Sequence, residues 1–235
     1  MKTIIQHPEI GQIELCTRNG SRGISFRVTA DKVRITVNPG LSQSVFPLSK
    51  ERTEWIIKAQ EKLAIHTQKL TFTPDTILKT HSFTLSFVPT EKIKTTFAAQ
   101  RKNETLIIYF KPKTDFTTAQ SQLVIKRILT HFLRIEATAF LPNRLKTLAE
   151  QYGFEYTQLK INSAHRRWGS CSVQKHINLS LYLMLLPEEL INFVIVHELC
   201  HTREMNHGEK FKQLMRTIFS NYNELNQSLK KQSTL

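Results

Sequence analysis

Two histidines four residues apart constrain this chain more than any other feature. His197 and His201 stand in the stretch VHELCH, and on a helix residues at this spacing share one face. The sequence therefore predicts a helix that presents both imidazoles to one metal ion. Glu198 directly follows the first histidine, so its carboxylate would lie beside the metal. This is the H-E-x-x-H pattern, in which two histidines bind zinc and the glutamate is the general base.

A third histidine follows at a distance that a turn can close. His207 lies six residues after His201, between Asn206 and Gly208, two residue types that tolerate the left-handed backbone of a helix end. Three protein ligands leave the fourth position of zinc open, which is typical of catalytic sites. We therefore predict Zn²⁺ bound by His197, His201 and His207, with Glu198 as the catalytic residue.

The residues before the motif favour a rigid helix. Pro187 suits the first helical position, and Glu188 and Glu189 suit the positive end of the helix dipole. Apolar residues at helical spacing then bury the helix and hold the histidines still. These residues are Ile191, Val194, Ile195 and Leu199.

Composition indicates a soluble globular protein. The 235 residues are 40% hydrophobic and 22% charged, enough for one large domain or two small ones. The three cysteines form no C-x-x-C pair, which argues against a disulfide framework or zinc ribbon. The longest apolar run, residues 181–186, is too short to cross a membrane, and the apolar start of the chain ends by Gln6, too soon for a signal peptide. We therefore expect a cytoplasmic location and no membrane partner.

The charge balance favours acidic partners. The net charge is +14 and the sequence pI is about 9.8, as in many proteins that bind nucleic acid. The Lys and Arg residues are dispersed along the chain, with no block of like charge. Charge alone therefore indicates a possible nucleic-acid partner and supplies no binding motif.

The order of elements predicts an α+β fold. Alternating apolar residues indicate strands at 24–28 and 33–37, joined by a hairpin at 30–32, and then a helix over 48–68. Strands follow at 83–87, 92–97 and 105–110, with a hairpin loop at 100–103. We place the boundary near residue 115, so that residues 1–114 form a β-rich N-terminal region and residues 115–235 a helix-rich domain.

The second half opens on a long helix. Asp115 or Thr117 can cap it, Leu141-Pro142 interrupts it, and Gly153 follows its last turn. Strands are expected at 154–161 and 177–183, with a turn at 173–176, and a last helix at 208–219. A strand just before a metal-binding helix can lie along the cleft and accept an extended peptide at its free edge.

Several residues near the motif have two readings. Arg167 and Trp168 precede Gly169 and are predicted to contact substrate, although this stretch could equally close a tight turn beneath the cleft. Arg166, Arg167, Lys175 and His176 could bind an acidic or nucleic-acid-linked substrate, or remain solvated. The group that stabilises the oxyanion stays open among His165, Arg167, His176 and Tyr182.

Three further residues close to the ligands also have alternatives. Cys171 could be a fourth ligand, although three histidines suffice. Cys200 is most simply a small buried residue. Glu204 lies one turn beyond His201 and could orient a ligand imidazole, or be a solvated carboxylate.

The motifs resemble a known family. Arg167-Trp168-Gly169-Ser170-Cys171, the H-E-x-x-H stretch at 197–201 and Asn206-His207-Gly208 with Phe211 resemble the YgjP-like metallopeptidases, which are related to the SprT-like and WLM zinc proteases. Residues 22–28 and Trp55-Ile56 are similar to that family too. The resemblance implies a zincin-like catalytic domain over 115–235 with a short β-hairpin, one zinc on the three histidines, a catalytic Glu198, and peptide or protein substrates. Metzincins share the ligand spacing, but Glu204 stands at their glycine position and no Met-turn is evident.

The sequence thus predicts a zinc-dependent metallopeptidase that hydrolyses peptide bonds. One alternative is a nucleic-acid-binding protein with a structural or vestigial zinc site. Glu198 argues against it, because a structural site has no use for a carboxylate beside the metal. The other alternative, a zinc hydrolase of a non-peptide amide, is not excluded by any residue.

Overall fold

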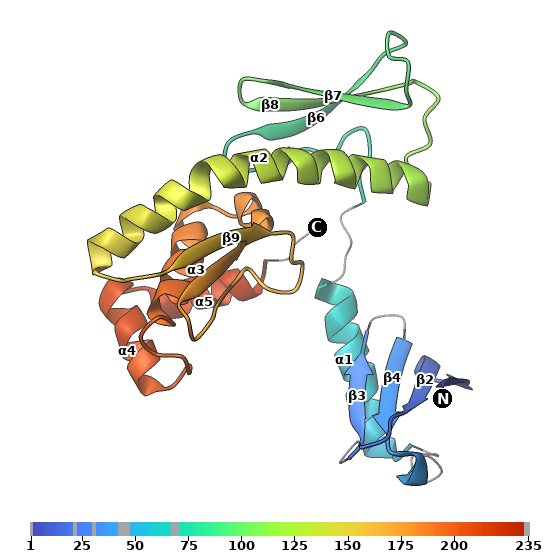
Figure 1. Cartoon of the computed structure of the whole chain (residues 1–235). Coiled ribbons are helices and arrows are strands. Elements are labelled where there is room, and N and C mark those ends of the chain that lie inside the picture. The colour runs from blue at the N-terminus through green and yellow to red at the C-terminus, as the bar shows by residue number, and fades with distance from the viewer. Residues whose placement is uncertain (1, 21–22, 30–31, 42–47, 67–70, 233–235) are drawn as a thin grey trace. The chain divides into compact units, whose positions relative to one another are not determined.

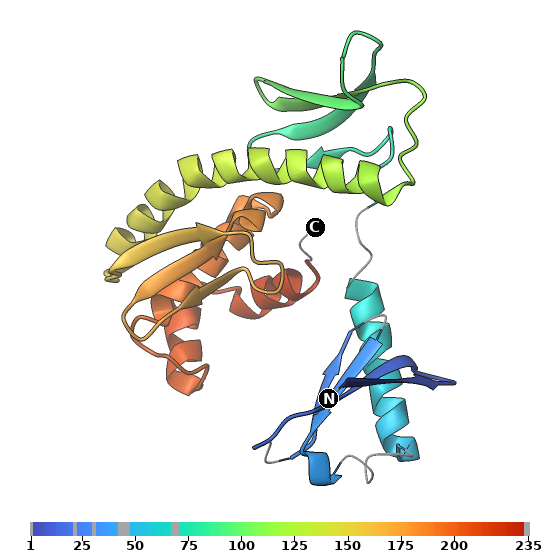
Figure 2. The same cartoon turned by 45° about the vertical axis from the view of Figure 1, so that its right-hand side comes forward.

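The chain divides into two compact units, residues 1–69 and residues 70–235. The computed structural model describes residues 2–20, 23–29, 32–41, 48–66 and 71–232. Figures 1 and 2 show that strands and helices are present in both units. The fold is therefore α+β, with a β-rich N-terminal part, as the sequence predicts.

The first unit is a four-stranded sheet with one helix. Its order is β1-β2-β4-β3, in which β2 and β4 are parallel and the other pairs antiparallel. In β4 every second residue is buried, and these side chains join Ile56 of the helix in one small core. The elements are β1 Lys2–His7, β2 Gly11–Thr17, β3 Ser25–Val28, β4 Lys32–Val37, the 3-10 turn η1 Pro39–Leu41 and α1 Lys50–His66.

The predicted hairpin and helix of this unit are present. β3 and β4 pair with Phe26 opposite Ile35, while residues 30–31 of the predicted turn lie outside the described residues. Residues 67–68 of the predicted helix lie outside them as well. The alternation of apolar and polar residues was therefore sufficient to predict these two strands.

The second unit begins with another four-stranded sheet, in the order β5-β6-β8-β7. Its strands are β5 Leu78–Lys79, β6 Thr84–Pro89, β7 Phe97–Lys102 and β8 Thr105–Phe110. The prediction of a strand at 92–97 and a loop at 100–103 was wrong: the strand begins at Phe97 and the turn is centred on Asn103, whose φ of 51° is left-handed. Asparagine is one of the few residues that accept this conformation readily.

Helix α2, Ala119–Tyr152, lies between this sheet and the rest of the unit (Figures 1 and 2). Thr118 is its N-cap, whose side chain accepts a hydrogen bond from the Ser121 N–H, and Gly153 ends it at a left-handed φ of 68°. The predicted interruption at Leu141-Pro142 was wrong, because the helix continues through Pro142. Proline leaves the carbonyl of Thr138 without its helical donor, and Thr138 is exposed, so water can supply one.

A three-stranded sheet follows α2. Its order is β10-β11-β9, with β9 Gln158–Asn162, β10 Gly169–Cys171 and β11 His176–Ser180. β11 is the middle strand, parallel to β9 and antiparallel to β10, so the strand expected along the cleft has no free edge. The short β10, which the sequence analysis did not predict, is an edge strand, as is β9. β11 also ends earlier than predicted, at the 3-10 turn η3 Leu181–Leu185.

The last elements are three helices, α3 Glu188–Cys200, α4 Glu209–Ile218 and α5 Tyr222–Lys230. α3 packs against α2, α4, α5 and the strands β10 and β11, and its apolar residues belong to one core that extends from Phe72 to Leu225. The boundary near residue 115 separates the β-rich and helix-rich stretches of the sequence, and it stays a prediction. No helix of the described residues is long and apolar enough to cross a membrane.

Candidate metal centre and active site

The centre is built on the last turn of α3. The helix is buried on nearly all sides, with Val194, Ile195, Val196 and Leu199 almost fully enclosed, as expected of a helix that is apolar all round. His197 and Glu198 therefore extend from a backbone with little freedom to move. His201 directly follows the last helical residue and is the C-cap.

Three imidazole nitrogens meet at one point. His207 Nε2 lies 3.0 Å from His197 Nε2 and 3.2 Å from His201 Nε2. Tetrahedral zinc, with Zn–N bonds of about 2.0–2.1 Å, separates its nitrogen ligands by about 3.3 Å. Among the described residues, these three histidines form the one group of His, Cys, Asp or Glu side chains close enough to hold a metal.

A backbone carbonyl fixes the orientation of one ring. His201 Nδ1 donates to the Glu204 carbonyl oxygen at 3.0 Å, which leaves the lone pair of Nε2 directed at the other two histidines. This contact is typical of metal-binding histidines. Glu204 therefore orients the imidazole, as the sequence suggested, but through its main chain and not its carboxylate.

The ring of Phe211, in α4, packs against all three imidazole rings. Its centroid lies 4.8, 4.6 and 4.8 Å from those of His197, His201 and His207. Phe211 is fully buried, so it fixes the distance between α4 and the end of α3. The helical spacing of Phe211 predicted a core residue and gave no sign of this second role.

Two of the histidines, His197 and His201, are held in the neutral form that binds metals. Burial, followed by the neighbouring His201 and His207, lowers the pKa of His197 to about 3. Burial also lowers the pKa of His201, against the hydrogen bond to the Glu204 carbonyl. Neutral rings with converging lone pairs are a donor set that suits a borderline-soft divalent cation such as zinc.

Glu198 is enclosed beside the histidines. Its side chain is 6% exposed, and burial raises its pKa to about 8, while the positive charge of Arg167 acts in the opposite direction. A Cβ at Gly169 would lie 2.7 Å from both Cγ and Oε1 of Glu198, so only glycine leaves room for the carboxylate against β10. Glycine here is needed for space, since its φ is not left-handed.

The residues surround a cavity of about 240 Å³. The edge strand β10 forms one wall and the histidines the other, with Glu198 between them. The lining residues are Gly169, Ser170, Cys171, His197, Glu198, His201, Met205 and His207. Such a cavity has room for a few water molecules or for one group of a larger substrate.

The two cysteines near the motif have different surroundings. Burial, and secondarily the Glu198 charge, raises the pKa of the Cys171 thiol, which donates to the Ser172 carbonyl at 3.4 Å. A protonated thiol is a poor ligand, and Cys171 is not part of the metal-binding group. Cys200 is fully buried, with its pKa raised by burial to about 12, in agreement with a packing role.

The other predicted site residues lie around the cavity without lining it. Arg167 is exposed, and its charge acts on Glu198. Trp168 is half-buried against the core, and its carbonyl accepts from the Ser180 N–H at 2.8 Å. Tyr182 is 2% exposed and shares a hydrogen bond of 3.0 Å with His165, and both line a different cavity.

Residues 22–232 match the YgjP-like, metallopeptidase domain family. The chain belongs to this family. The YgjP-like assignment covers most of both units and agrees with the motifs at 167–171, 197–201 and 206–208. The family is that of a metallopeptidase domain, which makes the protein a peptidase-type hydrolase with a metal requirement.

Two solved structures are similar to part of this YgjP-like chain. The metallopeptidase zymogen of Pyrococcus abyssi abylysin has 18% identity and a TM-score of 0.35, over 38% of this chain and 91% of its own. The metallopeptidase zymogen of Methanocaldococcus jannaschii jannalysin has 24% identity and a TM-score of 0.34, over 37% of this chain and 91% of its own. A comparison with curated proteins finds no match.

Proposed function

We propose that this protein is a zinc-dependent metallopeptidase with Glu198 as general base. The observation that carries the proposal is that three Nε2 atoms converge in the same cavity that holds a buried carboxylate. A structural zinc site needs four ligands and no neighbouring base. The three unpaired cysteines accord with the expected cytoplasmic location, which stays a prediction.

Each residue has a defined role in this proposal. His197, His201 and His207 would hold Zn²⁺, which when bound polarises a carbonyl and lowers the pKa of water. Glu198 takes the proton of the attacking water and later passes it to the leaving amine. Burial raises the pKa of Glu198 to about 8, and the charge of a bound divalent cation would act in the opposite direction, toward the ionised carboxylate that accepts a proton.

The substrate would lie along β10. The outer side of this strand is unpaired in the three-stranded sheet, and an extended peptide can add to such an edge by main-chain hydrogen bonds. Gly169–Cys171 form the cavity wall opposite the histidines, so a peptide in this position would bring a carbonyl near Glu198. Arg167 and Trp168, at the start of this strand, are the proposed substrate contacts.

The test is the variant Glu198→Gln, which keeps the size of the side chain and removes the base. The zinc content and fold should survive, while hydrolysis of a peptide library falls by at least about 10²–10⁴-fold, the usual worth of general-base assistance. Zinc per chain is measured in parallel, because loss of metal would imitate loss of the base. His207→Ala is the matched control, expected to lose both zinc and activity.

Two results would contradict the assignment. A zinc-loaded Glu198→Gln protein that cleaves peptides at the wild-type rate would remove Glu198 from the chemistry. A wild-type protein that carries zinc and cleaves no peptide of the library, but hydrolyses small non-peptide amides, would favour the alternative substrate class.

A further inference from the structure

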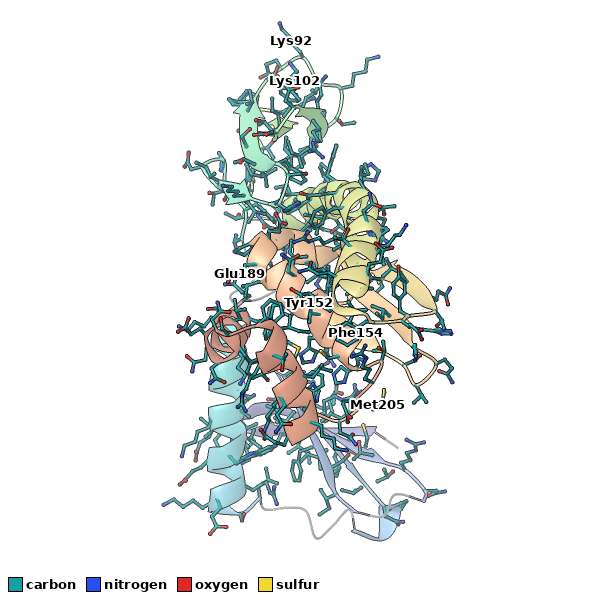
Figure 3. All side chains as sticks on the ribbon, turned by 90° about the vertical axis from the view of Figure 1, so that its left-hand side faces the viewer. Lys92, Lys102, Tyr152, Phe154, Glu189 and Met205 are labelled. Carbon is teal, nitrogen blue, oxygen red and sulfur yellow. The ribbon has the colours of Figure 1, made fainter. Side chains whose placement is uncertain are left out.

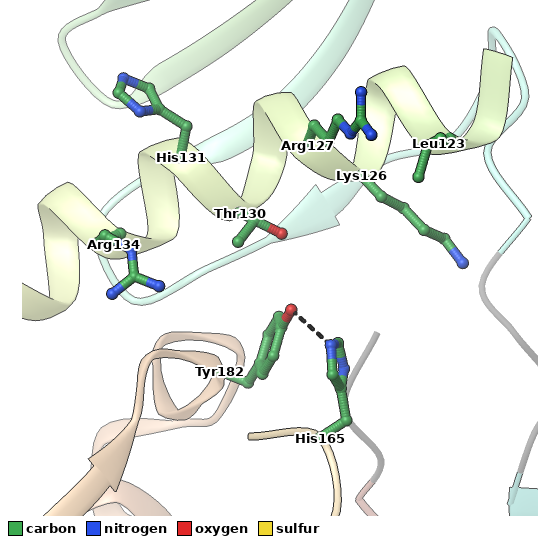
Figure 4. A pocket seen from close by; sticks show the side chains of 8 residues that line it. All are labelled: Leu123, Lys126, Arg127, Thr130, His131, Arg134, His165 and Tyr182. Atoms are coloured by element: carbon green, nitrogen blue, oxygen red, sulfur yellow. Dashed lines mark hydrogen bonds between the residues drawn. The ribbon is translucent and has the colours of Figure 1, made fainter. Parts of the chain in front are cut away.

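A second cavity, of about 450 Å³, lies between α2 and the segment that leads to β10 (Figure 4). One wall is a row of residues on α2 and the other is His165 with Tyr182. We call it the α2 groove. Its lining residues are Leu123, Lys126, Arg127, Thr130, His131, Arg134, His165 and Tyr182.

The α2 groove is basic, and Leu123 adds an aliphatic side chain to its lining. Lys126, Thr130 and Arg134 are spaced by four residues and point toward His165 and Tyr182, while Arg127 and His131 project away (Figure 4). The two cations lie about 12 Å apart along the helix axis. Among the described residues, neither has a carboxylate partner within ion-pair distance, and no acidic residue lines the groove.

The absence of acidic residues extends along the chain on both sides of the groove. The α2 segment from Phe116 to Ile135 contains no Asp or Glu, and neither does the segment from Tyr156 to Pro187. Arg166 and Arg167, which immediately follow His165, are both exposed. An anion that entered the groove would therefore meet positive charge without a competing carboxylate.

The groove and the metal centre are joined by a short segment. Gly169, in the wall of the metal cavity, follows four positions after His165, in the wall of the groove. A chain of that length spans at most about 14 Å. A peptide of a few residues that lay along β10 would therefore have a length sufficient to reach Lys126 and Arg134.

His165 is held in place by its neighbour. Its ring lies 4.4 Å from that of Tyr182, and the two side chains share the hydrogen bond of 3.0 Å. Tyr182 is itself fixed in η3, where Ser180 caps the turn and also donates to the Ala164 carbonyl at 2.8 Å. The wall of the groove is thus a built surface and not a mobile loop end.

We propose that the α2 groove binds acidic side chains of the substrate, so that the enzyme prefers peptides with Asp or Glu a few residues from the scissile bond. This inference rests on the proposed peptidase function. An acidic peptide fits better than a single-stranded nucleic acid, because Tyr182 is 2% exposed and offers no free face on which successive bases could stack. Leu123 in the lining suits instead the aliphatic parts of Glu side chains.

The first test measures binding without hydrolysis, so every protein in it also carries Glu198→Gln, and wild type here refers to the groove. Fluorescein-labelled peptides of alternating Glu and Ala, and of alternating Gln and Ala, are titrated with the wild-type protein and with Lys126→Gln/Arg134→Gln by fluorescence anisotropy. The Glu peptide should bind the wild type more tightly, and the double variant should bind it roughly 3–10-fold more weakly, as two exposed ion pairs imply. The difference in affinity between the Glu peptide and the Gln peptide should decrease at high salt.

A matched control separates the groove from net charge. Lys102→Gln/Lys146→Gln also removes two positive charges from the second unit. Lys102 ends β7 (labelled in Figure 3), and Lys146 is an exposed residue of α2. This double variant should bind the Glu peptide as the wild type does. Equal weakening in both double variants would overturn the groove as the binding site.

The second test measures cleavage of a peptide library in which acidic residues are paired with their amides. The wild type should cleave acidic sequences with a higher kcat/KM, and Lys126→Gln/Arg134→Gln should lose this preference while it cleaves the amide sequences normally. Cleavage with no acidic preference in either protein would overturn the inference and leave the peptidase proposal intact. Binding of the Glu peptide at the groove without cleavage of any peptide would contradict the peptidase proposal alone. Tighter, groove-dependent binding of a single-stranded oligonucleotide of equal charge would replace the peptide as the occupant.

Discussion

At the residue scale, the proposed active site depends on the absence of a methyl group, the Cβ that Gly169 lacks. Gly169 has no left-handed φ, so no backbone rule requires glycine there. The Glu198 side chain requires it, because a Cβ at position 169 would lie 2.7 Å from both Cγ and Oε1 of Glu198. Since Glu198 extends from a buried helix, the carboxylate and not the backbone would have to move.

Gly169→Ala should therefore reduce activity far more than stability. A displacement of the base by about 1 Å can cost about 10²-fold in rate, whereas β10 is a short edge strand whose pairing with β11 remains possible. Activity, zinc content and the urea midpoint are compared with those of Gly208→Ala, where a Cβ would meet nothing within 4 Å. Full activity in Gly169→Ala would show that the Glu198 side chain can move aside without loss of function, which would contradict the packing argument.

The second residue-scale prediction concerns Phe211. Because its ring contacts all three histidines, Phe211→Leu should loosen their convergence while it keeps an apolar side chain in the core. We expect zinc affinity to fall by about 10–100-fold, the usual effect of altering a group that orients ligands. Competition with a chromogenic chelator measures the affinity. Phe219→Leu, which removes a ring that packs on Phe193 and not on the histidines, is the control and should bind zinc normally.

The sequence predicted that the three histidines converge, but not what holds them in place. His197 and His201 follow from spacing, because a helix places residues i and i+4 together, and His207 follows from the helix end expected before it. The roles of Gly169, Phe211 and the Glu204 carbonyl come from contacts between α3, β10, α4 and the loop that follows α3. No local pattern records which distant backbone will face a glutamate, so these roles required the three-dimensional arrangement.

At the element scale, α2 is the framework of the second unit. One of its buried residues, Glu136, accepts hydrogen bonds from the Ser82 N–H and the Thr80 hydroxyl, which ties the helix to the turn before β6. The second carboxylate oxygen, Oε2, is buried and has no hydrogen-bond partner among the described residues. A buried carboxylate that is half satisfied should resist ionisation.

This arrangement predicts a pH dependence of stability. Burial raises the pKa of Glu136, partly offset by the hydrogen bonds of Ser82 and Thr80 and by the charge of His81. The folded protein therefore keeps the proton where the unfolded chain has released it. The contribution of this group to stability is fully present below the ordinary pKa of about 4.3 and is lost as the pH rises through the raised value.

Glu136→Gln keeps the shape and removes the titration. Between pH 4 and pH 8 the free energy of unfolding of the wild type should therefore decline relative to that of the variant, as measured by urea denaturation across that range. Parallel pH profiles of the two proteins would mean that Glu136 ionises in the folded protein as easily as in the unfolded chain.

Sequence patterns were insufficient to predict three features of the helices and strands. Pro142 suggested a break because proline usually ends a helix, but buried Leu141 and Leu145 on either side of it keep the chain packed through that turn. The predicted strand 177–183 extended into the apolar residues 181–183, which form a 3-10 turn, since a short apolar run has no period that separates a strand from a buried turn. β10, with three residues, was too short to show any alternation.

At the scale of the whole molecule, the described residues form two hydrophobic cores. One contains buried residues from Ile10 to Ile56, and the other contains buried residues from Phe72 to Leu225. The second core includes Phe116, whose ring lies 5.5, 5.6 and 4.9 Å from those of Phe87, Phe97 and Phe110 in the β5–β8 sheet. Residues 71–114 thus share a core with the proposed catalytic part, although the sequence analysis assigned them to the β-rich N-terminal region.

Two fragments distinguish the residue-115 boundary from one near residue 70. A fragment of residues 71–235 keeps the whole second core and should fold, bind one zinc per chain and unfold cooperatively. A fragment of residues 115–235 would expose Phe116 and the face of α2 that the β5–β8 sheet covers, and should therefore aggregate or bind hydrophobic dyes. Calorimetry, zinc content and size-exclusion chromatography report these outcomes. If residues 115–235 alone fold to a monomer that binds zinc as tightly as the full chain, the β5–β8 sheet is dispensable and the catalytic part begins at residue 115.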